Sequence, residues 1–326
     1  MQQSSPDAQA QARRQRDRIE ELRAETDRPV VRQHVVSEVL LKRFAVPHGS
    51  QGHVLHPFDL EHPERDPKRT GLRGCGRVDD FVPFASASLE KLWHQVENRL
   101  PAAAHAAERG DVFDHDQHVL VLKDFIALHL VRSLRYRALH ERILRESIAR
   151  LRLKLVTDWT QELRAQMLRR TGLHAAGPGG LLATADDLIE AHLDIYRNGA
   201  DLRIRIEDMF EKAKTVIRAA RLQVAMPEAG EFILGDVPAM TIRQDRGRMT
   251  FGMALGDSTA VVLPLGPRLL LVGRSPRDEA LTLDAPTVQA LNGLQIEAAH
   301  RYIYLRPRSG TERFVRDYLA AGGRQR

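Results

Sequence analysis

The sequence has little that would tie the protein to a disulfide framework, a cysteine-bound metal or a membrane. Cys75 is the single cysteine among 326 residues, which excludes an internal disulfide and gives no basis for a cysteine-ligated zinc site. No apolar run reaches the roughly 18 residues of a membrane-spanning helix, and the N-terminus has no apolar segment typical of a secretory signal. These absences predict a cytoplasmic protein that makes no membrane contact.

Aromatic residues and nucleotide-binding motifs are also scarce. Aromatics make up 5% of the chain, too few to suggest a stacking platform for single-stranded nucleic acid. The sequence has no phosphate-binding glycine loop, no dinucleotide-binding glycine pattern and no Gly-x-Ser-x-Gly turn. Nucleoside triphosphate hydrolysis and nicotinamide redox chemistry are therefore disfavoured. The histidines show no metal-ligand spacing, so the sequence identifies neither a metal nor a cofactor.

Positive charge is present in excess. The chain has 49 Lys and Arg against 43 Asp and Glu, a net charge of +6. Such a balance favours an anionic partner, nucleic acid or another polyanion. Of the 49 basic residues, 42 are Arg and seven are Lys. Because an alanine-rich, arginine-rich composition is also typical of GC-rich genomes, part of the charge has a second explanation.

The chain is organised around residues 114–171, which contain neither proline nor glycine. Their absence over this length predicts helix, with Asp114 or Asp116 as N-cap and Gly172 as C-cap. A single helix of this length would measure about 85 Å, so we expect a break, near Asp158. The first half is apolar nearly all round and is expected to be buried. From Arg132 to Lys154 the segment carries eight Lys or Arg against two Glu.

The remainder of the chain predicts an α+β fold. Helical spacing of apolar residues recurs in shorter segments before residue 220, and short apolar or alternating segments separated by Pro, Gly and Asp follow it. We expect N-terminal and central long helices packed on a C-terminal, mainly antiparallel sheet of five to six strands, with one terminal helix at about 285–299. The predicted organisation is a flexible basic tail (1–28), a single domain (29–307) with a helical part (29–220) and a sheet part (221–307), and a C-terminal tail (308–326).

Three short motifs resemble a known family. They are His34 with Leu41 and Phe44, then Phe232 to Pro238 with Asp236 before Val237-Pro238, then Pro264-Leu265-Gly266-Pro267. In this order and spacing they resemble the bacterial domain-of-unknown-function family 4238 over about residues 30–306. The family pattern has serine where this chain has Gly235 and Gly266. The resemblance implies an α+β fold and candidate polar positions, to which it adds Arg132 and Asn292, and it implies no established activity.

Seven residues are candidates for a functional site. His34 near a helix start, Asp236 at a strand end and Glu90 on a helix face are the candidate catalytic groups. The candidate substrate-binding residues are Arg43, Arg132, Arg135 and Asn292, because arginine binds anions in a bidentate manner. The three catalytic candidates have structural alternatives: His34 bonding a main-chain carbonyl, Asp236 stabilising a proline turn, and Glu90 with Glu97 pairing with basic residues such as Arg132.

Two functions follow from these residues. The first is a hydrolase for a phosphodiester or similar anionic substrate, in which His34, Arg132 and Asp236 converge on one pocket. The second is a non-catalytic protein that binds nucleic acid or another partner, as in a defence or toxin system. The spacing Arg135-x4-His140 also matches metal-independent ribonucleases of the helical HEPN type, although so short a pattern arises by chance in arginine-rich helices.

Overall fold

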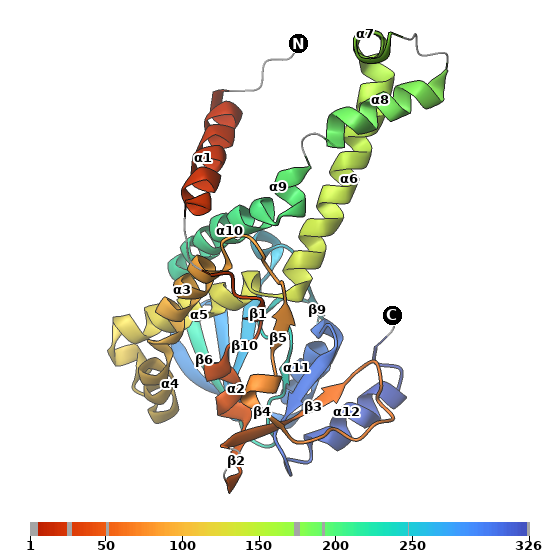
Figure 1. Ribbon diagram of the computed structural model, residues 1–326. Coiled ribbons are helices and arrows are strands. Elements are labelled where there is room, and N and C mark those ends of the chain that lie inside the picture. Colours follow the sequence, from red (N-terminus) through yellow and green to blue (C-terminus); the bar gives the residue numbers. More distant parts are fainter. Residues whose placement is uncertain are drawn as a thin grey trace. The chain divides into compact units, whose positions relative to one another are not determined.

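The protein was analysed as a computed structural model that describes residues 6–24, 28–49, 52–172, 177–190, 193–246 and 248–324 (Figure 1). Its contacts divide the chain into two compact units. The helical unit combines residues 1–26, 82–85 and 137–205, and the sheet unit combines residues 27–81, 86–136 and 206–326. Each unit is therefore assembled from segments that are far apart in the sequence. The predicted single domain with a helical part (29–220) and a sheet part (221–307) stays a prediction, and strands also occur before residue 220.

In the described part of the sheet unit, the larger sheet has six strands in the spatial order β12-β6-β11-β10-β8-β9. Neighbouring strands are antiparallel, except that β12 runs parallel to β6. The predicted α+β class with a mainly antiparallel sheet is thereby confirmed. The strands are Arg221–Pro227 (β6), Met240–Asp245 (β8), Arg248–Phe251 (β9), Ala260–Gly266 (β10), Leu269–Ser275 (β11) and Glu279–Leu283 (β12).

A smaller sheet includes two segments from the C-terminal part of the chain, around residues 231–236 and 301–307, that lie outside the larger sheet. Its strands follow the order β2-β3-β13-β7, with β4 paired to β3. The segments around residues 231–236 and 301–307 belong here because Ile233 and Ile303 pack with Phe58 rather than with the larger sheet. The strands are Val46–Pro47 (β2), His53–Asp59 (β3), Thr70–Gly71 (β4), Leu234–Gly235 (β7) and Tyr302–Leu305 (β13), and a separate pair joins Arg32–His34 (β1) to Arg77–Asp79 (β5).

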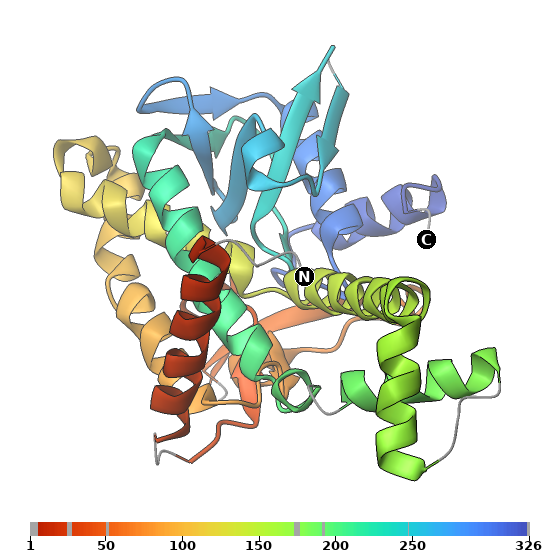
Figure 2. The ribbon, with the colours of Figure 1, turned by 90° about the horizontal axis from the view of Figure 1, so that it is seen from above.

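Helices cover both faces of the larger sheet (Figure 2). Helix α11, Ala285–Ala298, places Val288, Leu291 and Leu294 in a core with Val262 of β10 and Leu270 of β11. On the other face, Ile126 of α5 (Asp116–Val131) and Ile217 of α10 (Ala200–Ala219) lie against Gly273 of β11. The other helices of the sheet unit are Glu38–Phe44 (α2), Ser86–Glu97 (α3), Leu100–Arg109 (α4), Thr311–Ala320 (α12) and the 3-10 turns Leu72–Gly74, Val112–Asp114 and Leu255–Asp257.

The long central segment forms three helices: Asp116–Val131 (α5), Leu134–Asp158 (α6) and Thr160–Thr171 (α7). The predicted break near Asp158 is confirmed. A second break at Arg132 and Ser133 was not predicted from the sequence. Arg132 leaves the helical conformation with φ −84° and ψ 61°, and the main-chain N–H of Tyr136 donates to the Ser133 hydroxyl at 3.2 Å. Ser133 thus acts as an N-terminal cap for α6.

The helical unit contains small apolar clusters. Leu155 and Val156 of α6 pack with Leu163 of α7 and with α8, Pro178–Glu190. In a second cluster, Ile19 and Leu22 of α1, Pro6–Arg23, pack with the start of α10, Ala200–Ala219. A short helix, Asp194–Arg197 (α9), precedes α10. The segment predicted as a flexible tail therefore includes a helix in which Ile19 and Leu22 are buried.

The C-terminal segment after Pro307 also contains a helix that the sequence analysis did not assign. In α12 the apolar residues Phe314, Val315, Tyr318 and Leu319 lie on one side and pack against the smaller sheet. Their spacing of one, four and five residues is helical. The surrounding charge obscured this short pattern. Among the described helices, none has the length and apolar content needed to cross a membrane.

Candidate functional site

A buried polar cluster surrounds Arg132 at the C-terminal end of α5. Its side chain is 1% exposed. Nη1 lies 2.5 Å from Oε1 of Glu97, Nη2 lies 3.8 Å from Oε2 of Glu90, and Nε donates to the main-chain oxygen of His34. The guanidinium also stacks over the Trp93 ring, with Cζ 4.2 Å from the ring centroid. Arg132 thereby connects α5 to α3 and to β1.

The two glutamates differ in pKa because their environments differ. Burial raises the pKa of Glu90, and the Arg132 charge only partly opposes this effect. Burial also raises the pKa of Glu97, but the Arg132 charge and the hydrogen bonds to the carboxylate together lower it below its usual value. An ion pair this deep is favourable only when its hydrogen bonds are satisfied. The Arg132–Glu97 contact meets that condition, which makes Glu97 the ionised partner.

His34 lies at the edge of the same cluster. Its Nε2 accepts a hydrogen bond from Nε of Arg77 at 2.8 Å, and a carboxylate oxygen of Glu38 lies 3.6 Å from the same nitrogen. Burial, with the charges of Arg77 and Arg132, lowers the pKa of His34 to about 4. The imidazole is therefore neutral at pH 7. Because Arg77 already donates to its lone pair, it is poorly placed to accept a further proton.

His129 is a second buried histidine next to Arg132. It is fully buried, and its ring meets Phe125 edge-on with 4.7 Å between centroids. Burial, followed by the Arg132 charge, lowers its pKa to about 3. Within the described ranges, both ring nitrogens of His129, Nε1 of Trp93 and Oε1 of Glu90 have no hydrogen-bond partner. The cluster is therefore tightly packed, but some of its buried polar atoms have no hydrogen-bond partner.

The Asp236 carboxylate accepts hydrogen bonds from the main chain at the start of β13 in the smaller sheet. Its Oδ1 accepts the N–H of His300 at 2.6 Å, and its Oδ2 accepts those of Arg301 and Tyr302 at 2.7 and 2.9 Å. Burial raises its pKa, and these three bonds oppose the shift. In the part of the chain that the structure describes, Asp236 makes no hydrogen bond or ion pair with His34 or Arg132. Arg132 and His34 are thus brought together, whereas Asp236 acts as a turn anchor.

The remaining predicted residues have separate partners. Asn292 on α11 accepts the N–H of Ile233 at 3.0 Å and donates to the oxygen of Glu231 at 2.9 Å, which fixes the chain before β7. Arg135 stacks over Phe251, with Cζ 4.8 Å from the ring centroid. His140, the partner of Arg135 in the Arg-x4-His pattern, lies 3.3 Å from Asp201 of the helical unit. These contacts are structural in character.

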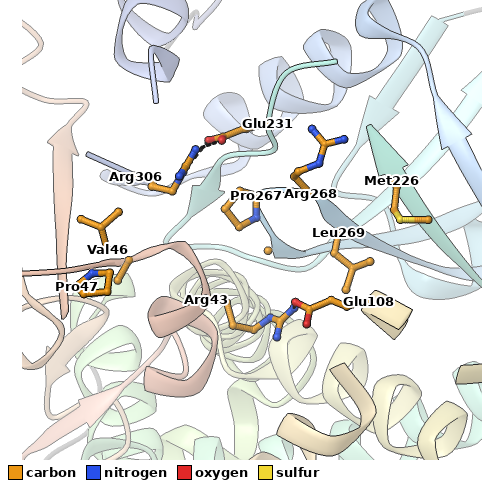
Figure 3. A pocket seen from close by; sticks show the side chains of 12 residues that line it. Arg43, Val46, Pro47, Glu108, Met226, Glu231, Pro267, Arg268, Leu269 and Arg306 are labelled. Atoms are coloured by element: carbon orange, nitrogen blue, oxygen red, sulfur yellow. Dashed lines mark hydrogen bonds and ion pairs between the residues drawn. The ribbon is translucent and has the colours of Figure 1, made fainter. Parts of the chain in front are cut away.

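Arg43, one of the predicted substrate-binding residues, lines a pocket (Figure 3). Its Nε donates to the oxygen of Leu265 at 2.5 Å, and its Nη2 lies 2.6 Å from Glu108. The same pocket is lined by Arg268, Arg306 and Glu231, none of which the sequence analysis selected. Arg268 could have been identified from the sequence, because it directly follows the Pro264–Pro267 motif.

Metal binding and catalysis by cysteine find little support in these side chains. Among the described residues, no three His, Cys, Asp or Glu side chains are grouped closely enough to hold a metal ion. Cys75 is buried, and burial raises the pKa of its thiol to about 12, so that it is protonated at neutral pH. The cluster around Arg132 provides a neutral imidazole and a closed ion pair, neither of which is free to bind an anion.

Comparison with known proteins gives one match. The family described as a protein of unknown function (DUF4238) matches residues 32–309, most of the chain. No curated protein and no solved structure matches the sequence.

Proposed function

Because the chain belongs to the DUF4238 family, a family of unknown function, its activity has to be inferred from its own residues, and we propose that it binds nucleic acid through helix α6 without catalysing a reaction on it. The observation that carries the proposal is the exposure of this helix. Along α6, all of which is described, no side chain is buried. A helix of 25 residues with no buried side chain has no face committed to a core, so its surface is available to a partner.

The charge of α6 identifies the chemistry of that partner. Between Arg137 and Asp158 there are six Lys or Arg against three Asp or Glu. Arg142, Arg145 and Arg152 are exposed and share one side of the helix, because their spacings of three and seven residues are close to one and two turns. Arg152 pairs with Asp186 of α8, whereas Arg142 and Arg145 have no ion pair with any described residue. Two unpaired arginines one turn apart suit successive phosphates.

Duplex nucleic acid fits this surface better than an anionic membrane. Large apolar side chains are exposed on α6 at Leu139, Ile143, Leu151 and Leu153. Helices that lie on membranes separate apolar and basic residues onto opposite faces. Here Arg150 falls on the same side as Leu139 and Ile143, since it follows them by about three and two turns. Few aromatics are available to stack on unpaired bases, so backbone contacts to a duplex are favoured.

The hydrolase hypothesis has weaker support in the contacts. It needs His34, Asp236 and Glu90 to act together, whereas Asp236 is used by a turn and Glu90 is buried beside Arg132. It remains a hypothesis with its own test in the Discussion. A cytoplasmic location, expected from the sequence, forms part of the present proposal because nucleic acid is accessible there.

The test measures binding of a fluorescently labelled duplex of about 20 base pairs, as DNA and as RNA, by anisotropy across a salt series. We expect affinity to fall steeply with salt, and the double variant Arg142→Glu/Arg145→Glu to bind at least about tenfold more weakly with a salt slope smaller by about two. The matched control is Arg277→Glu/Arg313→Glu, whose side chains are 75% and 90% exposed in the sheet unit. This control makes the same charge change away from α6.

Three outcomes would overturn the proposal. One is the absence of binding to either duplex at low salt. Another is an equal loss of affinity in both double variants, because binding would then depend on total charge rather than on α6. The third is binding to phosphatidylserine vesicles but not to the duplexes, since the partner of α6 would then be a membrane surface.

A further inference from the structure

A pocket of about 580 Å³ lies within the sheet unit, where segments from five parts of the chain meet (Figure 3). Arg43 comes from α2, Glu108 from α4, Met226 from β6 and Arg306 from the end of β13, while Arg268 lies in the turn between β10 and β11. A volume of this size accommodates a small organic molecule. None of the residues that line it belongs to the cluster around Arg132 or to α6.

The charges in this pocket leave one cation without a carboxylate partner. Arg43 pairs with Glu108, and Arg306 pairs with Glu231. Arg268 donates from Nη2 to the main-chain oxygen of Pro227 at 2.8 Å, and it has no ion pair with a described residue. Three arginines and two glutamates give the lining a net charge of +1. A ligand with one negative charge would balance it, whereas the two glutamates would disfavour a dianion.

The remaining walls are apolar. Val46 and Pro47 form one side, and Met226 and Leu269 form the side near Arg268, with Pro267 between them (Figure 3). Pockets for small molecules commonly combine such walls with a few polar groups that fix the orientation of the ligand. The charged group of the ligand would therefore lie at Arg268, and its apolar body would contact these side chains.

The pocket also contains residues from the motif segments. Arg43 lies within the stretch of the first motif, between Leu41 and Phe44; Gly266 and Pro267 belong to the third, and Glu231 immediately precedes the second. A Cβ atom on Gly266 would lie 3.5 Å from Nη2 of Arg43, an ordinary van der Waals distance. Position 266 therefore tolerates a side chain, and the glycine keeps the space beside Arg43 open.

We propose that this pocket binds a small organic carboxylate, with the carboxylate on Arg268 and an aliphatic body against Val46, Met226 and Leu269. This site is independent of nucleic-acid binding through α6. Arg268 can donate two parallel N–H groups to the two oxygens of a ligand carboxylate. A ligand with an ammonium group or a neutral hydroxyl group in that place could not accept both.

The test uses hexanoate as the probe in a ligand-observed NMR titration of the whole chain, with 1-hexanol and hexylamine as matched compounds. We expect hexanoate to bind and both comparison compounds to bind at least about tenfold more weakly. Arg268→Gln should lose at least tenfold in hexanoate affinity, and Arg277→Gln, an exposed arginine outside the pocket, should bind as the wild type does. Gly266→Val should also weaken binding, because its side chain would occupy space beside Arg43.

The proposal is overturned if hexanoate does not bind, if 1-hexanol binds equally well, or if Arg268→Gln retains wild-type affinity. A melting curve for each variant shows whether it is folded, and Gly266→Val gives a second measurement should Arg268→Gln be destabilised. The α6 variant Arg142→Glu/Arg145→Glu should bind hexanoate normally. A failure of hexanoate binding in the pocket can therefore be distinguished from a failure of nucleic-acid binding through α6.

Discussion

Nη1 of Arg132 lies 2.5 Å from Oε1 of Glu97, and both side chains are less than a tenth exposed. The arginine stands at the break between α5 and α6, and the glutamate ends α3. Removing one member of such a pair leaves the other charge buried without a partner, which costs far more than the pair contributes. The contact therefore makes the junction of three elements sensitive to a single substitution.

Arg132→Met should destabilise the protein by about 3–5 kcal/mol, because the Glu97 carboxylate would lose its partner. The double variant Arg132→Met/Glu97→Gln should be less destabilised than the sum of the two single variants. Urea denaturation measures both effects. Additive changes would show that the two side chains are not coupled.

Asp236→Ala should lower the free energy of unfolding by about 2–4 kcal/mol, because the N–H groups of His300, Arg301 and Tyr302 would lose their acceptor. Asp236→Asn should cost less, since the amide oxygen can still accept from two of them. Chemical denaturation of both variants provides the measurement. Wild-type stability in Asp236→Ala would contradict the anchoring role.

The wild-type protein should not cleave bis(p-nitrophenyl) phosphate, p-nitrophenyl phosphate or labelled duplexes above the buffer rate, because the proposed catalytic residues have structural partners. The same assays are run on the variants His34→Ala and Arg142→Glu/Arg145→Glu. Cleavage that disappears in His34→Ala and persists in the α6 variant would support the hydrolase hypothesis instead.

His129→Leu should reduce the acid sensitivity of the protein. The folded-state pKa of His129 is about 3, against an ordinary value of 6.5, so between these pH values the unfolded chain binds the extra proton. Unfolding therefore becomes easier as pH falls from 6.5. The loss of unfolding free energy between pH 7 and pH 5 should therefore be about 2 kcal/mol smaller in His129→Leu than in the wild type.

Urea denaturation at pH 5 and pH 7 measures the His129 effect, with the exposed His105→Leu as the control for loss of a histidine. Some pH dependence should persist in His129→Leu, because His34 also has a lowered pKa and titrates in the same direction. Glu97 and Arg132, which face His129, remain in place. An unchanged difference between the two pH values would refute the prediction.

Gly76→Ala should destabilise the fold by about 1–3 kcal/mol. Gly76 has φ +65°, and a Cβ atom there would lie 2.9 Å from both Cβ and the carbonyl oxygen of Val36. Gly71→Ala is the matched control, because a Cβ atom on Gly71 would meet no heavy atom within 4 Å and Gly71 has no positive φ. Thermal unfolding should show a clear loss for the first variant and little change for the second.

The sequence by itself determined the class of fold and the main elements. The absence of Pro and Gly over residues 114–171 indicated the central helices, and alternating apolar segments after residue 220 indicated the strands of the larger sheet. These features depend on local periodicity and on residues that interrupt helices, which are visible in a linear chain. The basic character of α6 was equally visible, since charge is a property of composition.

Only the tertiary structure decided what the candidate residues contact. The sequence could not place β7 and β13 beside β3, because strand pairing depends on distant partners. It could not show that Glu97 forms an ion pair with Arg132, or that the Asp236 carboxylate accepts hydrogen bonds from the N–H groups of residues 300–302. The pocket of Arg43 and Arg268 arises from five separate segments, and no local pattern encodes such a meeting. Burial and pairing are properties of the folded chain, and they determine which polar residues remain free to bind.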